Sequence, residues 1–432
     1  MPSALASYPQ TYYAASTPLP APAAPLAGRC EVDVCVVGAG LAGTSAALHL
    51  AERGYRVALL EEHRAGWGAS GRNGGQALVG VAISQSKLER LVSASDARAI
   101  WDVSVEALGF MRERIARHGI DCDWVDGHLQ VADKPRHLGE LRAAQAEMQR
   151  YGYPLPTLLD GAEVRRVVAS ARYIGGLYDA HSGHLQPLRY TLGLARAATE
   201  AGATLYEGTR AVDYASSASG VRVRTSAGGI DGEVHCKHLL LAGNTYLGAL
   251  APALARKIIP VGTFIIATAP LGEARARELI ANNAAVTDLN WIIDYFRRSA
   301  DHRLLFGGRV SYSGLSQFEA ESATHARLLR VFPQLADINV DYHWGGNLDI
   351  TLNRAPHFGR LQDNVWFLQG FSGHGVALTG IAGALAAQAI AGTSERFDVF
   401  ARIPHHDFPG GTLLRRPALV LAMLWYRLRD LL

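Results

Sequence analysis

The chain has 432 residues, of which 49% are apolar and 19% charged, and its formal net charge is +3. This composition is typical of a globular protein with a large core, and the length predicts about two to three domains. The small charge and the lack of a long basic run argue against nucleic acid as a partner, because nucleic-acid binding needs a concentrated positive face.

The cysteines and the chain start indicate the compartment. Cys30, Cys35, Cys122 and Cys236 form neither a CxxC pair nor a metal-ligand spacing, so we expect free thiols, no metal and a reducing cytoplasm. The first residues lack the basic and apolar regions of a secretory signal, and no stretch reaches the ~18 apolar residues of a membrane span. The sequence therefore predicts a cytoplasmic protein.

The first 28 residues differ from the rest. They carry no charged side chain and are rich in Ala and Pro, a composition that predicts an extended, flexible arm. Tyr8, Tyr12 and Tyr13 support another interpretation, in which the arm docks on the body or on a partner subunit. Both alternatives stay open at this point.

The ordered chain begins with a strand, a helix and a second strand. Residues 32–37 and 57–60 are short apolar runs typical of buried strands. Residues 41–53 between them are rich in Ala and Leu and stop at Gly54, which predicts a helix.

The turn between this strand and helix is a GxGxxG motif made by Gly38, Gly40 and Gly43. In this context the glycines allow a tight turn, approach of a pyrophosphate to the helix N-terminus and close packing of helix on strand. Glu61, at the end of the second strand, is placed to accept a hydrogen bond from a ribose 2′-OH and to repel a 2′-phosphate. The pattern predicts FAD or NAD rather than NADP, and ordinary packing glycines are the alternative.

The next stretch, "GWGASGRNGGQ" at residues 66–76, separates FAD from NAD. Its glycines let the backbone approach a flat ring closely. Ser70, Asn73 and Gln76 carry polar groups suited to the edge of a flavin. We expect a flavin contact here, and a mobile surface loop is the alternative.

The middle of the chain mixes helices and strands. Residues 92–150 look helical and amphipathic, residues 173–260 alternate strand and helix signals, and residues 257–312 contain several strand-like runs.

A second glycine-rich turn, "QGFSGHGVALTG" at residues 369–380, leads into a helix that is apolar on nearly every face and therefore buried. A helix N-terminus there would stabilise the negative charge of a reduced flavin, with His374 as a further donor. A histidine hydrogen-bonded within the turn is the alternative.

These stretches also carry a resemblance to a known family. "VVGAGLAGTSAALHL" and "GWGASGRNGGQ", then "GGLYDAHSGHLQPLRYTLGLARAA", and late "WGGNLDITLNRAPHFGRL" and "GFSGHGVALTGIAG" resemble FAD-dependent amine oxidoreductases of the D-amino-acid oxidase, glycine oxidase and sarcosine oxidase superfamily. Within it, the chain is most similar to the γ-glutamylputrescine oxidase branch.

The resemblance implies an α/β protein, α+β overall, with a Rossmann-like FAD-binding domain and a substrate domain with a mainly antiparallel sheet and helices. The FAD-binding domain is expected from residues 29–91, 163–256 and 345–400, and the substrate domain from residues 92–162 and 257–344. Besides the arm, a tail from 401 to 432 remains. Its apolar, arginine-containing helix is expected to dock on the body or on a second subunit rather than on a membrane.

The resemblance and the chemistry together predict the site residues. The expected FAD contacts are Gly38, Gly40, Leu41, Ala42, Gly43, Glu61, Glu62, Trp67, Gly68, Ala69, Ser70, Arg72, Asn73, Gly74, Gly75, Gln76, Ala211, Gly243, Gly373, His374, Gly375 and Val376. His374, Tyr295 and Gln76 are expected to be catalytic. Aromatic and basic candidates for the substrate pocket are Trp291, Phe296, Arg297, Arg309, Trp344 and Arg354, with ordinary core or solvated positions as the alternative for each.

The chain departs from the sarcosine oxidases at three places. No Cys stands in "GGNLDITLNRAP", which predicts noncovalent FAD, and Ala377 stands where those enzymes carry a carboxylate-binding Lys. The position of their oxygen-activating Lys falls near Leu305. A small α-amino acid is therefore not the expected substrate, and the electron acceptor is O2 or another oxidant.

The expected reaction is removal of a hydride from a carbon beside an amine nitrogen, with transfer to the N5 atom of FAD and hydrolysis of the imine. An apolar pocket favours the neutral amine that this requires. γ-Glutamylputrescine or a related γ-glutamylated or long-chain amine is the first choice of substrate, and an oxidase is favoured over a dehydrogenase. The alternatives are oxidation of another secondary amine, polyamine or N-substituted amino acid, and a non-catalytic FAD-binding protein. A homo-oligomer is possible.

Overall fold

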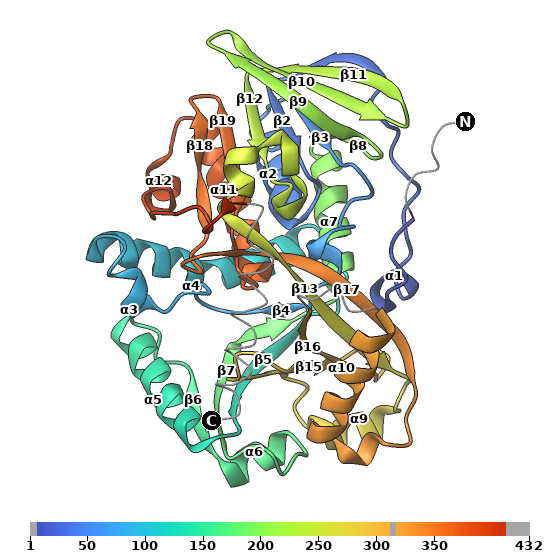
Figure 1. Cartoon of the computed structure of the whole chain (residues 1–432), viewed down its shortest axis with the longest axis vertical. Coiled ribbons are helices and arrows are strands. Elements are labelled where there is room, and N and C mark those ends of the chain that lie inside the picture. The colour runs from blue at the N-terminus through green and yellow to red at the C-terminus, as the bar shows by residue number, and fades with distance from the viewer. Residues whose placement is uncertain (1–6, 312–316, 412–432) are drawn as a thin grey trace.

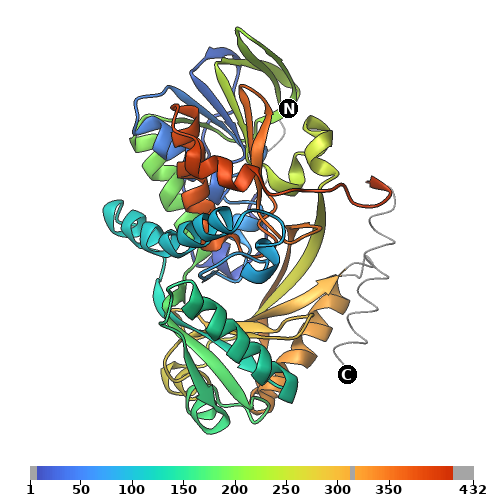
Figure 2. The ribbon, with the colours of Figure 1, turned by 90° about the vertical axis from the view of Figure 1, so that its left-hand side faces the viewer.

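The computed structural model describes residues 7–311 and 317–411 (Figure 1). The basic tail expected from the sequence therefore lies outside the described residues from 412 onward. The described chain contains three sheets, of six, nine and four strands. Figures 1 and 2 show the six-stranded sheet in the upper half of the molecule and the nine-stranded sheet in the lower half.

The six-stranded sheet contains the strand–helix–strand unit expected at the start of the ordered chain. Strands β2 (Val34–Val37) and β3 (Val57–Leu60) are parallel neighbours, and α2 (Leu41–Ala51) connects them. Every residue of both strands and of the helix is buried. Continuous apolar runs of this kind are typical of a parallel sheet that is covered on both faces.

The strand order of this sheet is β18-β19-β12-β2-β3-β8, and all neighbours are parallel except β18 and β19. The remaining strands are β8 (Thr204–Tyr206), β12 (His238–Leu241), β18 (His357–Gln362) and β19 (Val365–Gln369). The chain moves outward from β2 toward β3 on one side and from β12 toward β19 on the other. This reversal of direction is the point at which open α/β sheets bind ligands, beyond the carboxyl ends of the strands.

Helix α11 (Gly375–Ile390) covers this sheet beside α2 and is almost wholly buried. The two helices approach closely at Gly383, where an added Cβ would lie 2.6 Å from the carbonyl oxygen of Ala42. The buried C-terminal helix expected from the sequence therefore packs directly on the nucleotide-binding helix.

The nine-stranded sheet is mainly antiparallel, with β5 and β14 as a parallel pair. Its strands are β4 (Gln76–Ala77), β5 (Val125–Ala132), β6 (Thr157–Asp160), β7 (Gly175–His184), β13 (Ile258–Thr268), β14 (Ala285–Asp288), β15 (Tyr295–Arg298), β16 (Leu304–Ser311) and β17 (Val340–Thr351). The fold class expected from the sequence is confirmed: a Rossmann-like domain is joined to a domain with a mainly antiparallel sheet.

Two segments cross the expected domain boundaries. Strand β7 lies in the nine-stranded sheet, between β5 and β4, although residues 163–256 were expected in the FAD-binding domain. Helix α4 (Ala94–Arg117), expected in the substrate domain, buries Ile100 and Met111 in the same core as the helices of the six-stranded sheet. A strand pattern does not say which sheet will supply its partner, and an apolar helix face does not say which core it will cover.

The four-stranded sheet has the order β1-β11-β10-β9 and lies at the edge of the nucleotide-binding half. Its strands are β1 (Gly28–Glu31), β9 (Arg210–Ser217), β10 (Gly220–Ala227) and β11 (Ile230–Cys236). The N-terminal arm runs from β1 down to α1 (Tyr12–Ala15), on the nine-stranded sheet (Figure 1). Tyr13 is fully buried there, so the described part of the arm has the docked arrangement.

The remaining helices are α3 (Gln85–Leu88), α5 (Pro135–Arg150), α6 (Gly161–Val167), α7 (Pro187–Glu200), α8 (Pro252–Ala255), α9 (Glu273–Leu279), α10 (Gln317–Val331) and α12 (Glu395–Ala401). Within the described ranges, none of the helices alone has the length and apolarity to cross a membrane. The pair α11 and α12 meets that test by length and composition, with a bend of 115° between them.

Candidate active site

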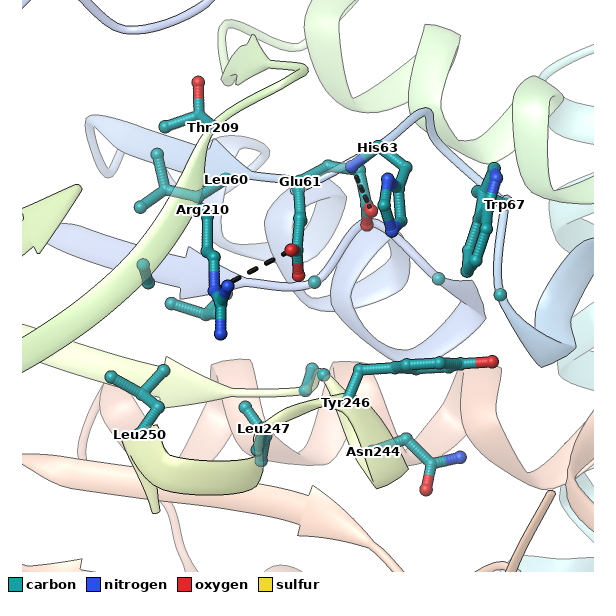
Figure 3. Close-up of a pocket in the computed structure, with 18 of the residues that line it drawn as sticks. Leu60, Glu61, His63, Trp67, Thr209, Arg210, Asn244, Tyr246, Leu247 and Leu250 are labelled. Carbon is teal, nitrogen blue, oxygen red and sulfur yellow. Dashed lines mark hydrogen bonds and ion pairs between the residues drawn. The ribbon is translucent and has the colours of Figure 1, made fainter. Parts of the chain in front are cut away.

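A pocket opens at the carboxyl ends of β2, β3 and β12, where the six-stranded sheet reverses its strand order. In Figure 3 one wall carries Glu61, His63 and Trp67, and the opposite wall carries Tyr246 and Leu247. The lining residues named by the sequence are Gly38, Gly40, Glu61, Glu62, Trp67, Gly68, Ala69, Ser70, Ala211 and Gly243. The pocket thus brings together the predicted ADP-binding residues and the first part of the loop in which flavin contacts were expected.

The glycines of the GxGxxG motif are required by close backbone contacts. Gly38 has φ +105°, and an added Cβ would lie 2.8 Å from the carbonyl oxygen of Ala242. At Gly43 the Cβ would come within 1.8 Å of the carbonyl oxygen of Gly38. Leu41, Ala42 and Gly43 form the buried first turn of helix α2, directly after the glycine turn.

Glu61 is the acidic group of the pocket. Its carboxylate accepts hydrogen bonds from the backbone N–H groups of Ala39 and His63, both at 2.9 Å. Burial raises the pKa of Glu61 to about 7, against the lowering effect of these two N–H groups. The carboxylate therefore ties the glycine turn to the chain after β3, at the edge of the pocket where a ribose is expected. Glu62 is exposed, with its carboxylate 3.7 Å from the Nε of Arg210.

The pocket also contains His63, Asn244 and Tyr246, which the sequence analysis missed, next to the predicted Trp67. The rings of His63 and Trp67 lie 3.9 Å apart, Tyr246 meets Trp67 edge-on at 5.9 Å, and Asn244 lies beside Tyr246. The available signal was the position of Gly243 directly after a buried strand, because the residues that follow such a strand lie at the ligand-binding edge of the sheet.

The loop at residues 66–76 forms a short 3₁₀ turn and then enters β4. The hydroxyl of Ser70 accepts a hydrogen bond from the N–H of Leu41, at the N-terminus of α2. The Asn73 side chain donates to the carbonyls of Ala69 and Ser70 and accepts from the N–H of Gly75. The polar groups expected at the flavin edge thus hold the loop in one shape.

The Arg72 side chain contacts both the loop and residues on the other side of it. Its guanidinium stacks 4.3 Å from the ring centre of Trp67 and donates to the carbonyls of Gly68 and Gly345 and to the hydroxyl of Tyr246. The side chain therefore connects the loop to Trp67 and Tyr246, which both line the pocket.

At its far end the loop meets the nine-stranded sheet. A Cβ at Gly74 would lie 2.8 Å from the ring of Tyr295, so this aromatic ring lies directly against the loop backbone. Burial raises the pKa of Tyr295, and the phenol is therefore neutral at physiological pH.

Gln76, in β4, begins a chain of hydrogen bonds that crosses the same sheet. The Thr287 hydroxyl donates to Oε1 of Gln76 at 3.4 Å, and Nε2 of Gln76 donates to the carbonyl of Val286. Since the hydroxyl has one proton, it accepts from Nε2 of His128 at its other contact. Burial lowers the pKa of His128 to about 4, so the chain is neutral. The sequence analysis missed His128 and Thr287, because neither lies in a glycine-rich segment.

His374 lies at the start of α11, in the turn that also contains Gly373, Gly375 and Val376. Its Nε2 hydrogen-bonds to the carbonyl of Val79 at 3.0 Å, and burial lowers its pKa. After burial, the nearby His374 ring also contributes to the lowered pKa of His128. Val79 lies outside this turn, so the contact is not the hydrogen bond within the turn that the structural alternative describes, and the catalytic role of His374 stays a prediction.

Several residues expected in the substrate pocket have other positions. Strand β15 alternates its side chains, so Tyr295 and Arg297 share the face toward the loop while Phe296 points into the opposite core, stacked 5.7 Å from Phe306. Phe296 is therefore a core residue. Arg354 is exposed in the turn after β17, which matches the solvated position named as its alternative, and its role in the substrate pocket stays a prediction.

The other substrate-pocket candidates divide into two groups. Arg297 and Trp344 are buried and hydrogen-bonded to the loop at residues 66–76. Trp291 is 41% exposed in the connection between β14 and β15. Arg309 lies in β16, opposite Phe264, and its side chain is outside the described atoms, so its role stays a prediction.

A pocket for an ADP-containing group in a Rossmann-like domain, with a loop that leads to a second sheet, is the architecture of a dinucleotide-dependent oxidoreductase. A family profile described as FAD dependent oxidoreductase matches residues 33–389, and the chain belongs to this family. The glycine turn, the Glu61 carboxylate and the loop beyond it fit the adenosine and pyrophosphate half of FAD.

Comparison with known proteins supports the same family assignment. The chain is 43% identical over 421 residues to gamma-glutamylputrescine oxidoreductase of Escherichia coli strain K12, with 97% of this chain and 98% of the relative covered. It is 25% identical to glycine oxidase of Geobacillus kaustophilus over 85% of this chain and 95% of the relative. The crystal structure of glycine oxidase from Bacillus cereus ATCC 14579 superposes with a TM-score of 0.72 at 22% identity, covering 88% of this chain and 100% of the other.

The protein is thus an FAD-dependent amine or amino-acid oxidoreductase, as the sequence predicts. The non-catalytic alternative has no support, because the relatives are named as oxidoreductases and oxidases.

Proposed function

We propose that the enzyme oxidises the carbon–nitrogen bond of a γ-glutamylated amine, with γ-glutamylputrescine as the leading substrate. The observation that carries this proposal is the 43% identity to gamma-glutamylputrescine oxidoreductase, which extends over 97% of this chain. Similarity of this extent includes the strands and turns of both domains, so it supports a related substrate as well as a related cofactor.

The residues support an uncharged amine. Gln76, Thr287 and His128 form a neutral hydrogen-bonded chain, and Tyr295 adds a neutral phenol next to it. None of these four side chains is a carboxylate that would bind an ammonium group, and burial favours the unprotonated amine. FAD, when bound, supplies the two-electron oxidising chemistry for which the amine must be neutral. In this proposal the four side chains orient the amine and exclude water.

The residue at position 377 argues against a small α-amino acid as substrate. Ala377 is buried in the first turns of α11 and provides no cation for an α-carboxylate. A substrate with a remote glutamyl group instead uses binding energy far from the reacting carbon to position it.

The test is anaerobic reduction of the bound flavin by γ-glutamylputrescine, putrescine, a longer polyamine and sarcosine, followed by steady-state kinetics. We expect kcat/KM to be highest for γ-glutamylputrescine and to fall strongly when the glutamyl group is removed. Equal rates with putrescine would contradict a glutamyl-binding pocket, and sarcosine as the best substrate would contradict the substrate class. Turnover with O2 against turnover with an artificial acceptor then distinguishes an oxidase, which we propose, from a dehydrogenase.

A further inference from the structure

The N-terminal arm contacts both halves of the molecule. Near its C-terminal end, the N–H of Leu26 donates to the Thr209 hydroxyl, next to the pocket. Near its N-terminal end, α1 packs on the nine-stranded sheet, where the Tyr12 and Tyr13 rings are buried (Figure 1). Between these points the arm is hydrogen-bonded to Arg64 and Glu207, and two of its tyrosines contact residues that adjoin or bind the loop at residues 66–76.

Tyr13 supports two residues at the far end of the loop. Its ring meets Trp344 edge-on at a centroid distance of 5.2 Å, and its hydroxyl accepts a hydrogen bond of 3.1 Å from the Arg297 guanidinium. Tyr13, Trp344 and Arg297 are all buried, so little solvent is available to replace either contact.

Both supported residues donate to loop carbonyls. The indole N–H of Trp344 donates to the carbonyl of Arg72 at 3.0 Å, and Nε of Arg297 donates to the carbonyl of Gly74 at 2.7 Å. The Arg297 guanidinium also donates to the carbonyl of Arg298. Its three acceptors are thus two backbone carbonyls and the Tyr13 hydroxyl, all of which are neutral. A buried cation loses much stabilisation when one such acceptor is removed.

Tyr8 acts at the near end of the loop. Its hydroxyl donates to the carbonyl of Ala65 at 2.8 Å, and the Arg64 guanidinium lies 5.0 Å above its ring. Arg64 and the buried Glu207 form an ion pair, and each also binds the arm, Arg64 at the carbonyl of Pro20 and Glu207 at the N–H of Ala23. The arm is thus joined to the chain between Glu61 and the loop.

From these contacts we propose that Tyr8 and Tyr13 are positioning residues of the FAD site, which hold the two ends of the loop at residues 66–76 in the shape that receives the cofactor. The substrate does not enter this inference, which concerns FAD binding alone. It gives the arm a part in cofactor retention, in addition to packing.

Tyr12 provides a matched control in the same helix. Its hydroxyl donates to Asp301 at the surface of the nine-stranded sheet, away from the loop supports. Tyr12→Phe and Tyr13→Phe each remove one hydroxyl from adjacent buried rings, so general weakening of the arm affects both variants alike.

The experiment is titration of apoprotein with FAD, with the visible circular dichroism of the bound flavin and the thermal unfolding of the apoprotein as further measurements. We expect Tyr13→Phe and Tyr8→Phe to raise the Kd for FAD about 3- to 10-fold. Tyr12→Phe is expected to change it less than about 2-fold. The flavin dichroism should change in Tyr13→Phe and stay as wild type in Tyr12→Phe.

A second variant tests the same contact from the other side. Trp344→Phe keeps a ring against Tyr13 and removes the N–H that holds the carbonyl of Arg72, so it should weaken FAD binding like Tyr13→Phe, and the double variant should be less than additive. Equal Kd changes in the Tyr12→Phe and Tyr13→Phe variants, or changes that follow only the unfolding temperature, would overturn the inference. Unchanged Kd in Tyr13→Phe and Trp344→Phe would overturn it as well.

Discussion

The adenosine side of the pocket and the substrate side of the active site are built in different ways. On the adenosine side, the glycine turn and Glu61 come from one continuous unit, from β2 through Glu61, and they act through backbone groups and one carboxylate. The proposed substrate side combines Gln76, His128 and Thr287, which hydrogen bonds on the nine-stranded sheet bring together, with His374 at the start of α11.

The difference explains why the two sides respond differently to substitution. At Gly38 and Gly43 an added Cβ would collide with another backbone atom, which cannot move aside as a side chain can. A site made of side chains on a sheet loses individual interactions, while the sheet itself is retained. The following experiments test that contrast, beginning with the largest expected effect.

Gly43→Ala should cause the largest loss. Its Cβ would lie 1.8 Å from the carbonyl oxygen of Gly38, so we expect a destabilisation of about 3 kcal/mol or more and little bound FAD. Urea unfolding and the flavin content of the purified protein measure this. The control is Gly139→Ala in α5, where nothing lies within 4 Å of the added Cβ; it should stabilise by roughly 0.5–1 kcal/mol. Equal stability of both variants would contradict the close-contact interpretation.

Glu61→Ala should weaken FAD binding strongly while leaving the fold intact. Two backbone N–H groups lose their acceptor and the ribose loses its expected partner, so the Kd should rise about 10- to 150-fold. Titration of apoprotein gives the value. The exposed neighbour is the control: Glu62→Ala should stay within about 3-fold of wild type, and a similar loss in both would show that only net charge matters.

Thr287→Val should affect the substrate side alone. It keeps the shape of the side chain but removes the hydroxyl between His128 and Gln76, so we expect flavin reduction to slow about 10-fold, since one hydrogen bond contributes about 1 kcal/mol or more. The Kd for FAD should not change. Thr287→Ser keeps the hydroxyl and should reduce the flavin at close to the wild-type rate. A slow Thr287→Ser variant would show that packing, and not the hydroxyl, causes the loss.

The pH profile tests whether the hydrogen-bond chain is neutral. Because burial lowers the pKa of His128 to about 4, protonation of this ring is disfavoured until the pH falls well below its usual range near 6.5. We therefore expect kcat/KM to rise with pH toward the pKa of the substrate amine, about 10.4 for an alkyl ammonium, without an inflection near 6.5. His128→Gln should lower the rate but keep the shape of the profile. An inflection near 6.5 that disappears in this variant would show that His128 titrates.

Arg354→Ala should have the smallest effect. The side chain is exposed after β17, so we expect KM and kcat to change less than about 2-fold. A large rise in KM would show that a substrate group binds near this turn and that Arg354 belongs to the substrate pocket.

The sequence predicts the nucleotide half well because its signals are local. The GxGxxG turn, Glu61 and the loop at residues 66–76 stand within a few strand lengths of one another, and the structure brings Gly38, Glu61 and Ser70 to one pocket. Tyr246 escaped notice because one glycine after a strand is a weak signal.

The substrate half is less predictable for a physical reason. Period-two alternation shows that neighbours on a strand face opposite ways, but it does not show which face meets the cofactor. Phe296 and Tyr295 are adjacent aromatic residues, and only the packing of β15 separates a core residue from a site residue. Likewise, Arg297 and Trp344 donate hydrogen bonds to backbone carbonyls of the loop, and both contact Tyr13 of the arm. No local sequence pattern predicts the position of that arm.

The hydrogen bond between Tyr13 and Arg297 joins residues 284 positions apart. During synthesis Tyr13 leaves the ribosome before Arg297, which follows roughly 15 to 60 s later at about 5–20 residues per second. Until Arg297 and Trp344 have emerged, the carbonyls of Arg72 and Gly74 lack the donors that hold them. The glycine turn can fold early, but the proposed role of the arm predicts that FAD is stably bound only late in synthesis, after most of the chain has been made.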